Sequence, residues 1–188
     1  MSEPGARHWR PRGVPTATPV PRRLKPWIDE PGSLTRRLRH LAGEDFAVRV
    51  IRECWSPGWP DERLRLRSGL RGALWLREVL LCRGHQPLIY ARSVIPATSL
   101  RGPLRRLRAL GRQPLGTLLF GRYPVRRGAI EIAPVSRRDR LGRRAADCGG
   151  APVWARRSVF RIAGRPLLVT EVFLAELLEE LGDDNGHR

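Results

Sequence analysis

Two apolar runs separated by a short polar break, Arg83–Gln86, stand out in the middle of the chain, between residues 73 and 96. Runs of Leu, Val, Ile, Trp and Tyr on either side of a glycine-containing turn predict a β-hairpin. Strand side chains alternate between two faces. One face of the first predicted strand therefore consists of Trp75, Arg77, Val79 and Leu81. A buried lone charge costs far more than a buried methylene, so Arg77 on this apolar face requires an anionic partner.

The run of residues 166–174 carries the complementary feature near the other end of the chain. One face of this predicted strand consists of Leu167, Val169, Glu171 and Phe173. Glu171 is thus a carboxylate among apolar neighbours, and we interpret Arg77 and Glu171 as two poles of one enclosed polar site. The pattern also fits a structural ion pair between these residues, or one residue facing water at a sheet edge, because ionised groups on strands are usually solvated or paired.

Leucine spacing and capping residues predict four helical segments. The first follows the N-cap residue Ser33 and ends at Gly43. The second begins at the Gly102–Pro103 pair, where proline suits the first turn of a helix. Two shorter helical segments are expected at residues 117–120 and 176–181.

The remaining alternating segments predict further strands. They lie at residues 46–54 and 129–133, and a closing hairpin joins residues 153–162 to residues 166–174. Residues 55–63 have the composition of a Pro/Gly loop, and the Arg-rich residues 64–70 fit either an edge strand or a loop. The order of helix, strands, two helices and strands predicts an α+β domain in which an antiparallel sheet has its helices packed on one side.

Length and composition favour one domain with flanking polar segments. A chain of 188 residues has enough length for a single core. Residues 1–26 contain six prolines among Arg, Gly and Thr, so we expect a disordered basic arm. The folded domain is expected at residues 27–181, with a mobile loop at 136–152 and a polar tail at 182–188.

The net charge of +18 raises the possibility of a nucleic-acid-binding protein. However, residues 1–29 and 137–147, both expected to be unstructured, together carry 11 of the basic residues and only 4 acidic ones. The sequence contains no helix-turn-helix, zinc-finger or RNP-like motif, so no specific nucleic-acid partner is expected. A basic surface would equally attract a small anionic substrate.

Cysteine, histidine and hydropathy patterns exclude several other classes. The three cysteines, Cys54, Cys82 and Cys148, form no CxxC pair, and the four histidines have no ligand spacing. Neither a disulfide framework nor a metal site is therefore expected. No apolar run reaches the roughly 18 residues of a membrane-spanning helix, and the N-terminus lacks the apolar region of a secretory signal.

Six sequence motifs occur in the order found in one bacterial enzyme family. They are W-L-R-E-V-L-L-C (75–82), A-R-S-V-I-P (91–96), L-G-R-Q-P-L-G-T-L-L-F (110–120), I-E-I (130–132), W-A-R-R-S (154–158) and G-R-P-L-L-V-T-E-V-F-L (164–174). Together they resemble bacterial chorismate lyase, also called chorismate–pyruvate lyase, over residues 27–175. The segment 136–152 and the Pro-rich arm depart from that family.

The resemblance implies a six-stranded antiparallel sheet around a buried site. It implies cleavage of chorismate to 4-hydroxybenzoate and pyruvate, the committed step towards ubiquinone. It further implies a cytoplasmic monomer that uses neither metal nor organic cofactor and retains its product strongly.

Five site residues carry over through the motifs. Arg77, in W-L-R-E, is expected to hold the ring carboxylate, and Glu171, in L-V-T-E-V-F-L, to face the ring hydroxyl. Leu115, in P-L-G, would supply a backbone contact. Leu34 takes the place of a family methionine, and Arg92 matches another family arginine near the site.

Two other classes stay open at the level of sequence. The domain could be a non-catalytic small-molecule sensor of the same fold, as in the effector-binding domains of some bacterial transcription regulators. It could also be a basic nucleic-acid-binding protein, for which salt-dependent binding to nonspecific DNA would be the distinguishing observation.

Overall fold

An antiparallel sheet of eight strands runs through the part of the chain that the computed structural model describes, which is residues 9–68, 72–119 and 124–182. The strand order is β1-β6-β7-β8-β4-β3-β2, and β5 pairs with β7 beside β6. The strands are β1 (Arg10–Pro11), β2 (Phe46–Ser56), β3 (Leu74–Arg83), β4 (Gln86–Pro96), β5 (Val125–Arg127), β6 (Glu131–Pro134), β7 (Pro152–Ile162) and β8 (Arg165–Leu174).

The two predicted hairpins form the centre of this sheet. The β3–β4 hairpin turns at Gly84, whose φ of 55° lies in the left-handed region that glycine adopts without strain. The β7–β8 hairpin lies directly beside it, because β4 pairs with β8. This pairing places Glu171 opposite Ala91 on one side and opposite Arg156 on the other. Segments far apart in the sequence therefore share one sheet face.

Six α-helices and four 3-10 helices occur in the described residues. The α-helices are α1 (Lys25–Ile28), α2 (Leu34–Ala42), α3 (Pro60–Leu66), α4 (Leu115–Leu119), α5 (Arg140–Asp147) and α6 (Ala175–Glu180), and the 3-10 helices are η1 (Arg22–Leu24), η2 (Gly43–Asp45), η3 (Ala97–Ser99) and η4 (Gly102–Ala109). The predicted N-cap of α2 is confirmed, since the Ser33 hydroxyl accepts a hydrogen bond from the Arg36 N–H at 3.3 Å.

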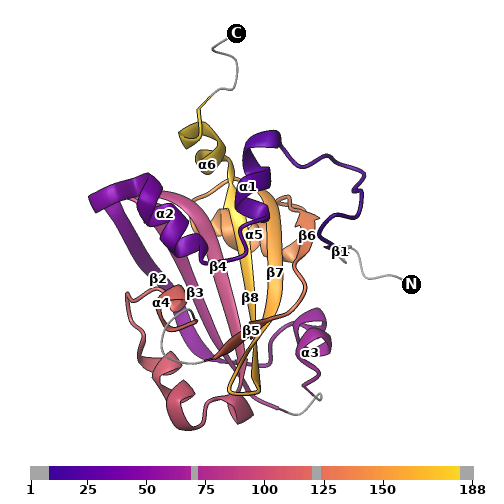
Figure 1. Ribbon diagram of the computed structural model, residues 1–188, viewed down its shortest axis with the longest axis vertical. Coiled ribbons are helices and arrows are strands. Elements are labelled where there is room, and N and C mark those ends of the chain that lie inside the picture. Colours follow the sequence, from indigo (N-terminus) through magenta and orange to yellow (C-terminus); the bar gives the residue numbers. More distant parts are fainter. Residues whose placement is uncertain (1–8, 69–71, 120–123, 183–188) are drawn as a thin grey trace.

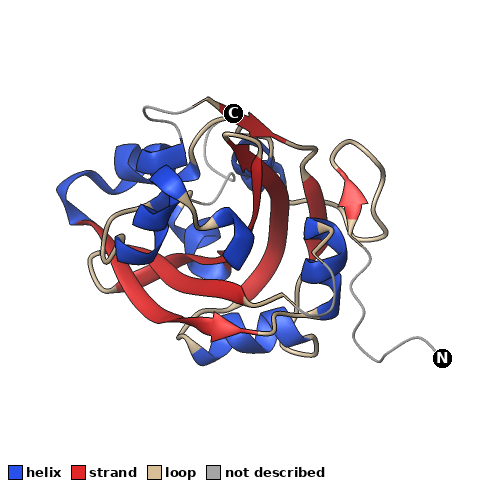
Figure 2. Cartoon of the chain, turned by 90° about the horizontal axis from the view of Figure 1, so that it is seen from below, coloured by secondary structure: helices blue, strands red, loops and turns tan. Residues whose placement is uncertain are grey.

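Helices cover both faces of the curved sheet, as Figure 1 and Figure 2 show. On one face, α1, α2 and η4 bury Trp27, Leu34 and Leu104 against the inward side chains of the central strands. On the other face, Leu141 of α5 and Leu66 of α3 pack over the alternate side chains of the same strands. The central strands are consequently covered on both faces, which explains why every residue of β3 except Arg83 is buried.

The α+β antiparallel architecture predicted from the sequence is confirmed, with two corrections. The sheet has eight strands in the described residues rather than six, because the short strands β1 and β5 add to it. The helices do not lie on one side only, because α3 and α5 cover the second face. Apolar positions on both faces of the central strands require a cover on each face.

The expectation of a loop at residues 136–152 is wrong for residues 140–147, which form α5. Asp139 caps this helix by accepting a hydrogen bond from the Gly142 N–H at 2.7 Å. Leu141 and Ala145, four residues apart, are buried on the same helix face. The apolar face of this helix consists of only these two side chains among several arginines, so the sequence pattern indicated a polar loop.

Two other segments also differ from the expectation. Residues 60–66 form α3, where the sequence indicated a Pro/Gly loop running into an edge strand or loop. The described part of the basic arm contains β1, which pairs with β6 through Arg10 and Ile132, and also η1. Within the described residues, no helix is long and apolar enough to cross a membrane.

Candidate active site

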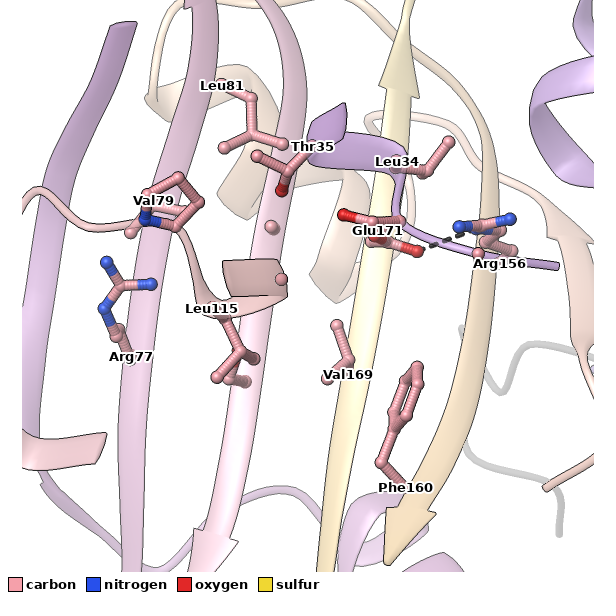
Figure 3. Close-up of a pocket in the computed structure, with 16 residues that line it drawn as sticks. Leu34, Thr35, Arg77, Val79, Leu81, Leu115, Arg156, Phe160, Val169 and Glu171 are labelled. Atoms are coloured by element: carbon pink, nitrogen blue, oxygen red, sulfur yellow. Dashed lines mark hydrogen bonds and ion pairs between the residues drawn. The ribbon is translucent and has the colours of Figure 1, made fainter. Parts of the chain in front are cut away.

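A pocket lies between the inward face of the sheet and the two segments that begin α2 and α4 (Figure 3). Its cavity volume is about 40 Å³, well below the roughly 300–1,000 Å³ of most small-molecule sites, so the walls must move apart to admit a ring. Val79, Leu81, Phe160 and Val169 give it apolar walls. Arg77 lies at one side and Glu171 at the other, so the pocket is mainly apolar with opposite charges at its two ends.

Arg77 reaches this pocket from the middle of β3 and is 2% exposed. Its Nε donates to Glu53 Oε1 at 2.8 Å, and its Nη2 donates to the carbonyl oxygens of Gly111 and Gln113 at 2.8 and 3.0 Å. Burial lowers the pKa of Arg77, and the ion pair with Glu53 opposes that shift. These bonds fix the guanidinium plane and use Nε and Nη2, and within the described residues they leave Nη1 available to a ligand.

Glu171 enters the pocket from β8, and Arg156 of β7 holds its carboxylate. The Arg156 Nε donates to Glu171 Oε2 at 2.7 Å, as the dashed line in Figure 3 marks. Arg156 is 1% exposed, whereas the Glu171 side chain is 15% exposed. One carboxylate oxygen thus has a fixed partner, and the other is free to accept a hydrogen bond from a bound molecule.

Two helix N-termini close the pocket opposite the sheet. Ser33, Leu34 and Thr35 begin α2, and Leu115 and Gly116 begin α4. The first N–H groups of a helix have no partner within the helix, so backbone N–H groups are available on this side of the pocket. The site therefore offers a guanidinium, a carboxylate and backbone donors around an apolar centre.

The structure brings together four of the five residues that the sequence analysis singled out. Leu34, Arg77, Leu115 and Glu171 all line the pocket. The alternative of a direct ion pair between Arg77 and Glu171 is wrong, because each has its own partner, Glu53 and Arg156.

Arg92, the fifth of these residues, does not line this pocket. It lies on β4 between Ala91 and Ser93, which both line the pocket, so its side chain points to the opposite sheet face. There its Nε and Nη2 donate to the two carboxylate oxygens of Glu62 at 2.6 and 3.1 Å. The register of the hairpin agrees with this orientation. Residues paired across neighbouring strands lie on the same face, and Arg77 is paired with Ser93 and not with Arg92.

A buried charge network surrounds Arg92 on that second face. Glu78, which is 0% exposed, accepts hydrogen bonds from Arg92 at 2.7 Å, from Tyr90 at 2.6 Å and from Arg144 of α5 at 2.7 Å. Burial lowers the pKa of Arg92, but the hydrogen bond and charge of Glu62 outweigh burial and raise it above the ordinary value. The network ties α3 and α5 to the sheet and is separate from the pocket.

Sequence reasoning missed Arg156. It belongs to the W-A-R-R-S motif, and it alternates with Trp154 and Phe160 on one face of β7. The rule that identified Arg77, a cation on an apolar strand face, would have identified Arg156 as well. Ser93 and Thr35 were also missed, because single hydroxyl residues carry no distinctive pattern.

The arrangement can bind a small ring that carries an anionic group at one end and a hydrogen-bond donor at the other. Arg77 matches a carboxylate, and Glu171 matches a hydroxyl. The described residues contain no group of three or more His, Cys, Asp or Glu arranged to hold a metal ion. The chemistry available from the side chains is orientation, charge stabilisation and proton movement at Glu171.

An α+β domain with a mainly apolar pocket that carries a charged side chain at each end is typical of a small-molecule-binding domain. A solved structure of the same fold is the effector domain of PhnF from Mycobacterium smegmatis, with a TM-score of 0.50 and 13% sequence identity over 77% of this chain and 90% of that chain. The family model for chorismate lyase matches residues 13–181, and the chain belongs to the chorismate lyase family.

Curated relatives agree with this assignment. A probable chorismate pyruvate-lyase of Methylococcus capsulatus is 48% identical and covers 82% of this chain and 96% of its own length. A probable chorismate pyruvate-lyase of Halorhodospira halophila is 44% identical over 94% of this chain and 95% of its own length. The chorismate pyruvate-lyase of Photorhabdus laumondii is 38% identical over 84% of each chain.

Proposed function

We propose that this protein cleaves chorismate to 4-hydroxybenzoate and pyruvate, the reaction that supplies the ring of ubiquinone. The observation that carries the proposal is the placement of Arg77 and Glu171 at opposite ends of one enclosed pocket in a member of the chorismate lyase family. A ring with a carboxylate at one end and a hydroxyl at the other matches this separation of charges.

The reaction needs positioning more than a strong nucleophile. The ether bond between the ring and the enolpyruvyl group breaks, the ring carbon that bears the hydroxyl loses its hydrogen, and the released fragment gains a proton to become pyruvate. The ring becomes aromatic, which supplies a large driving force. The protein must hold the substrate in the reactive conformation and keep water away from it.

Arg77 would bind the ring carboxylate of substrate and product. Its bonds to Glu53 and to two backbone carbonyls fix the guanidinium before a ligand arrives, so little ordering is required on binding. A hydrogen bond between ionised partners contributes about 1.5–3 kcal/mol, which makes this contact a major part of the affinity.

Glu171 would accept a hydrogen bond from the ring hydroxyl and assist proton movement as aromaticity develops. The Arg156 bond holds one of its oxygens and leaves the other directed at the pocket. The backbone N–H groups of Leu34 and Leu115 would complete the contacts to the substrate oxygens, and their side-chain identity matters less for that contact.

We also propose that the protein acts as a monomer in the cytoplasm and without a metal or organic cofactor. The basic arm would contribute β1 and η1 to the folded unit, and none of its described residues would contribute to the site. Gel filtration at two protein concentrations tests whether the protein is a monomer in solution.

The decisive experiment supplies purified protein with chorismate and no added cofactor, and follows 4-hydroxybenzoate and pyruvate. Both products should appear in equal amounts. Binding of 4-hydroxybenzoate without turnover of chorismate would indicate a non-catalytic sensor of the same fold instead. Formation of a different hydroxybenzoate would correct the position of cleavage.

A further inference from the structure

We infer that Arg156 is a positioning residue that couples the carboxylate of Glu171 to the N-terminal wall of the pocket. This inference rests on the proposed function of the site. Its starting point is that the guanidinium of Arg156 serves two groups that belong to different parts of the chain. On one side it binds Glu171, and on the other it binds the backbone that leads into α2.

In the second set of contacts, one nitrogen atom of Arg156 binds three backbone carbonyl groups. The Arg156 Nη1 donates to the carbonyl oxygens of Trp27, Ile28 and Glu30, at 3.0, 3.1 and 2.8 Å. Trp27 and Ile28 are the last residues of α1, whose final carbonyl groups have no partner within the helix. A buried cation at this helix end satisfies those carbonyls and is favoured by the helix dipole.

The clamped backbone continues directly into the pocket wall. Only Pro31 separates Glu30 from Gly32, and Gly32, Ser33, Leu34 and Thr35 all line the pocket. Arg156 therefore fixes the backbone a few residues before this wall, and it also orients the carboxylate of Glu171. A displacement of Glu171 or of this backbone must therefore displace the other, because within the described residues Arg156 is hydrogen-bonded to both.

Arg127 reinforces the clamp from the outer side. Its Nη1 donates to the carbonyl oxygens of Glu30 and Pro31 at 3.0 and 3.2 Å, and its Nε donates to the Ser158 hydroxyl at 3.1 Å. Burial, and after it the neighbouring charge of Arg156, lower the pKa of Arg127 to about 10. The guanidinium groups of Arg127 and Arg156 thus both bind the backbone of residues 27–31. The carboxylate of Glu171, which binds Arg156, balances part of their positive charge.

The coupling has a consequence for product release. For a ligand to leave the enclosed pocket, a wall must move, and the wall at Gly32–Thr35 is attached to Arg156 through the clamped carbonyls. Movement of this wall would displace Arg156 and weaken its hydrogen bond to Glu171. A ligand whose hydroxyl is bound to Glu171 would thus favour the closed wall, and the same contact would contribute both to turnover and to retention of the product.

The test compares Arg156→Gln and Arg156→Lys with the matched control Arg157→Gln. Arg157 is the next residue of β7 and is also buried, at 7% exposure, but it faces the other side of the sheet, where it pairs with Glu131 and Asp61 at 2.8 Å. A loss caused only by removing a buried ion pair from β7 would appear in both glutamine variants. Circular dichroism and thermal melting establish that each variant is folded.

Arg156→Gln should lower kcat by on the order of 100-fold, as expected when a reacting group is misplaced. It should also accelerate 4-hydroxybenzoate dissociation and increase amide hydrogen exchange at residues 27–35. Arg156→Lys retains a cation for Glu171 but cannot make all the carbonyl bonds, so kcat should recover more than product retention does. Arg157→Gln should leave all three measurements near the wild-type values.

The outcomes separate this inference from the proposed function. Wild-type kcat and product retention in folded Arg156→Gln, or an equal loss in Arg157→Gln, would overturn the coupling while the lyase assignment stands. If Arg156→Gln does not fold, the difference between kcat and product retention in Arg156→Lys decides the question, and parallel changes in the two would overturn the coupling. Absence of chorismate turnover in the wild-type protein would overturn the proposed function, and absence of 4-hydroxybenzoate binding as well would overturn both.

Discussion

Gly116 of α4 lies against Ser33 of α2 so closely that a Cβ atom at Gly116 would be 2.5 Å from the Ser33 Oγ. The same Cβ would be 3.2 Å from the Thr35 Oγ1. The two segments that cover the pocket therefore meet at Gly116, where a methyl group would overlap the Ser33 hydroxyl. This contact closes the pocket on the side away from the sheet, and it explains why a P-L-G sequence stands at this point of the chain.

Gly116→Ala should loosen the closed pocket, because the added methyl group forces α2 and α4 apart. We expect at least a tenfold weaker affinity for 4-hydroxybenzoate, which corresponds to about 1.4 kcal/mol, with little change in the melting temperature. Isothermal titration calorimetry measures this affinity. Adding Ser33→Gly removes the hydroxyl that clashes and should restore affinity, since glycine is also accepted as an N-cap. Gly72→Ala, where no atom lies within 4 Å of the added Cβ, is the control.

Arg77→Ala should weaken binding of both chorismate and 4-hydroxybenzoate, because it removes the proposed carboxylate partner. The loss of one or two charge-assisted hydrogen bonds, each of about 1.5–3 kcal/mol, predicts a decrease in affinity of about 10-fold to 10⁴-fold. Arg49→Ala, which removes an exposed arginine from β2, is a matched control of equal charge change. Wild-type affinity in Arg77→Ala would remove Arg77 from the site.

Glu171→Gln should reduce kcat more than it changes KM. The glutamine carbonyl can still accept the hydrogen bond from Arg156, so the fold around it should persist, but it cannot take a proton. Loss of a general base typically costs about 10²–10⁴-fold in rate. Steady-state kinetics with chorismate measure the effect. An unchanged kcat would leave Glu171 with a structural role only.

Arg92→Ala should destabilise the protein without changing the affinity of the pocket. Removing the guanidinium leaves the buried carboxylate of Glu62 without its cationic partner and removes one of the donors to Glu78, which keeps Tyr90 and Arg144. Breaking a buried ion pair in this way typically costs about 3–5 kcal/mol. Urea denaturation measures the loss, and calorimetry with 4-hydroxybenzoate at a temperature where the variant is folded should give the wild-type dissociation constant. A selective loss of affinity would return Arg92 to the site.

Glu78 should make the stability depend on pH in the acidic range. Burial alone raises the pKa of Glu78, but hydrogen bonds from Arg144 and Tyr90, with the charge of Arg92, lower it below the ordinary value of 4.5. A carboxyl group with a lowered pKa in the folded state stabilises that state above the unfolded pKa, and the contribution is lost as the pH falls through the folded pKa.

The free energy of unfolding should therefore decrease as the pH falls below about 4.5, and Glu78→Gln should flatten this dependence relative to the wild-type protein. Urea denaturation at a series of pH values measures the slope. Glu44→Gln, at an exposed position of η2, is the control and should leave the slope unchanged. Identical slopes for Glu78→Gln and the wild-type protein would contradict the prediction.

The sequence determined the central strands and the face on which each of their side chains lies. Alternation with period two placed Arg77 and Glu171 on apolar faces of their strands, and the structure shows both in one pocket. The same rule, applied to residues 154–160, would have found Arg156. Arg92 entered through the family resemblance, whereas the hairpin register pairs Arg77 with Ser93 and places Arg92 on the opposite face.

Only the tertiary structure decided which charges meet. Arg77 binds Glu53, which no spacing along the chain indicated, and Glu171 binds Arg156 because β8 lies between β4 and β7 in the sheet order. Helix α5 and the second covered face likewise appear only when the sheet exists to receive Leu141. The physical reason is that periodicity depends on neighbours in sequence, whereas ion pairs and closure of a pocket depend on strand order and on the close approach of segments such as Gly116 and Ser33.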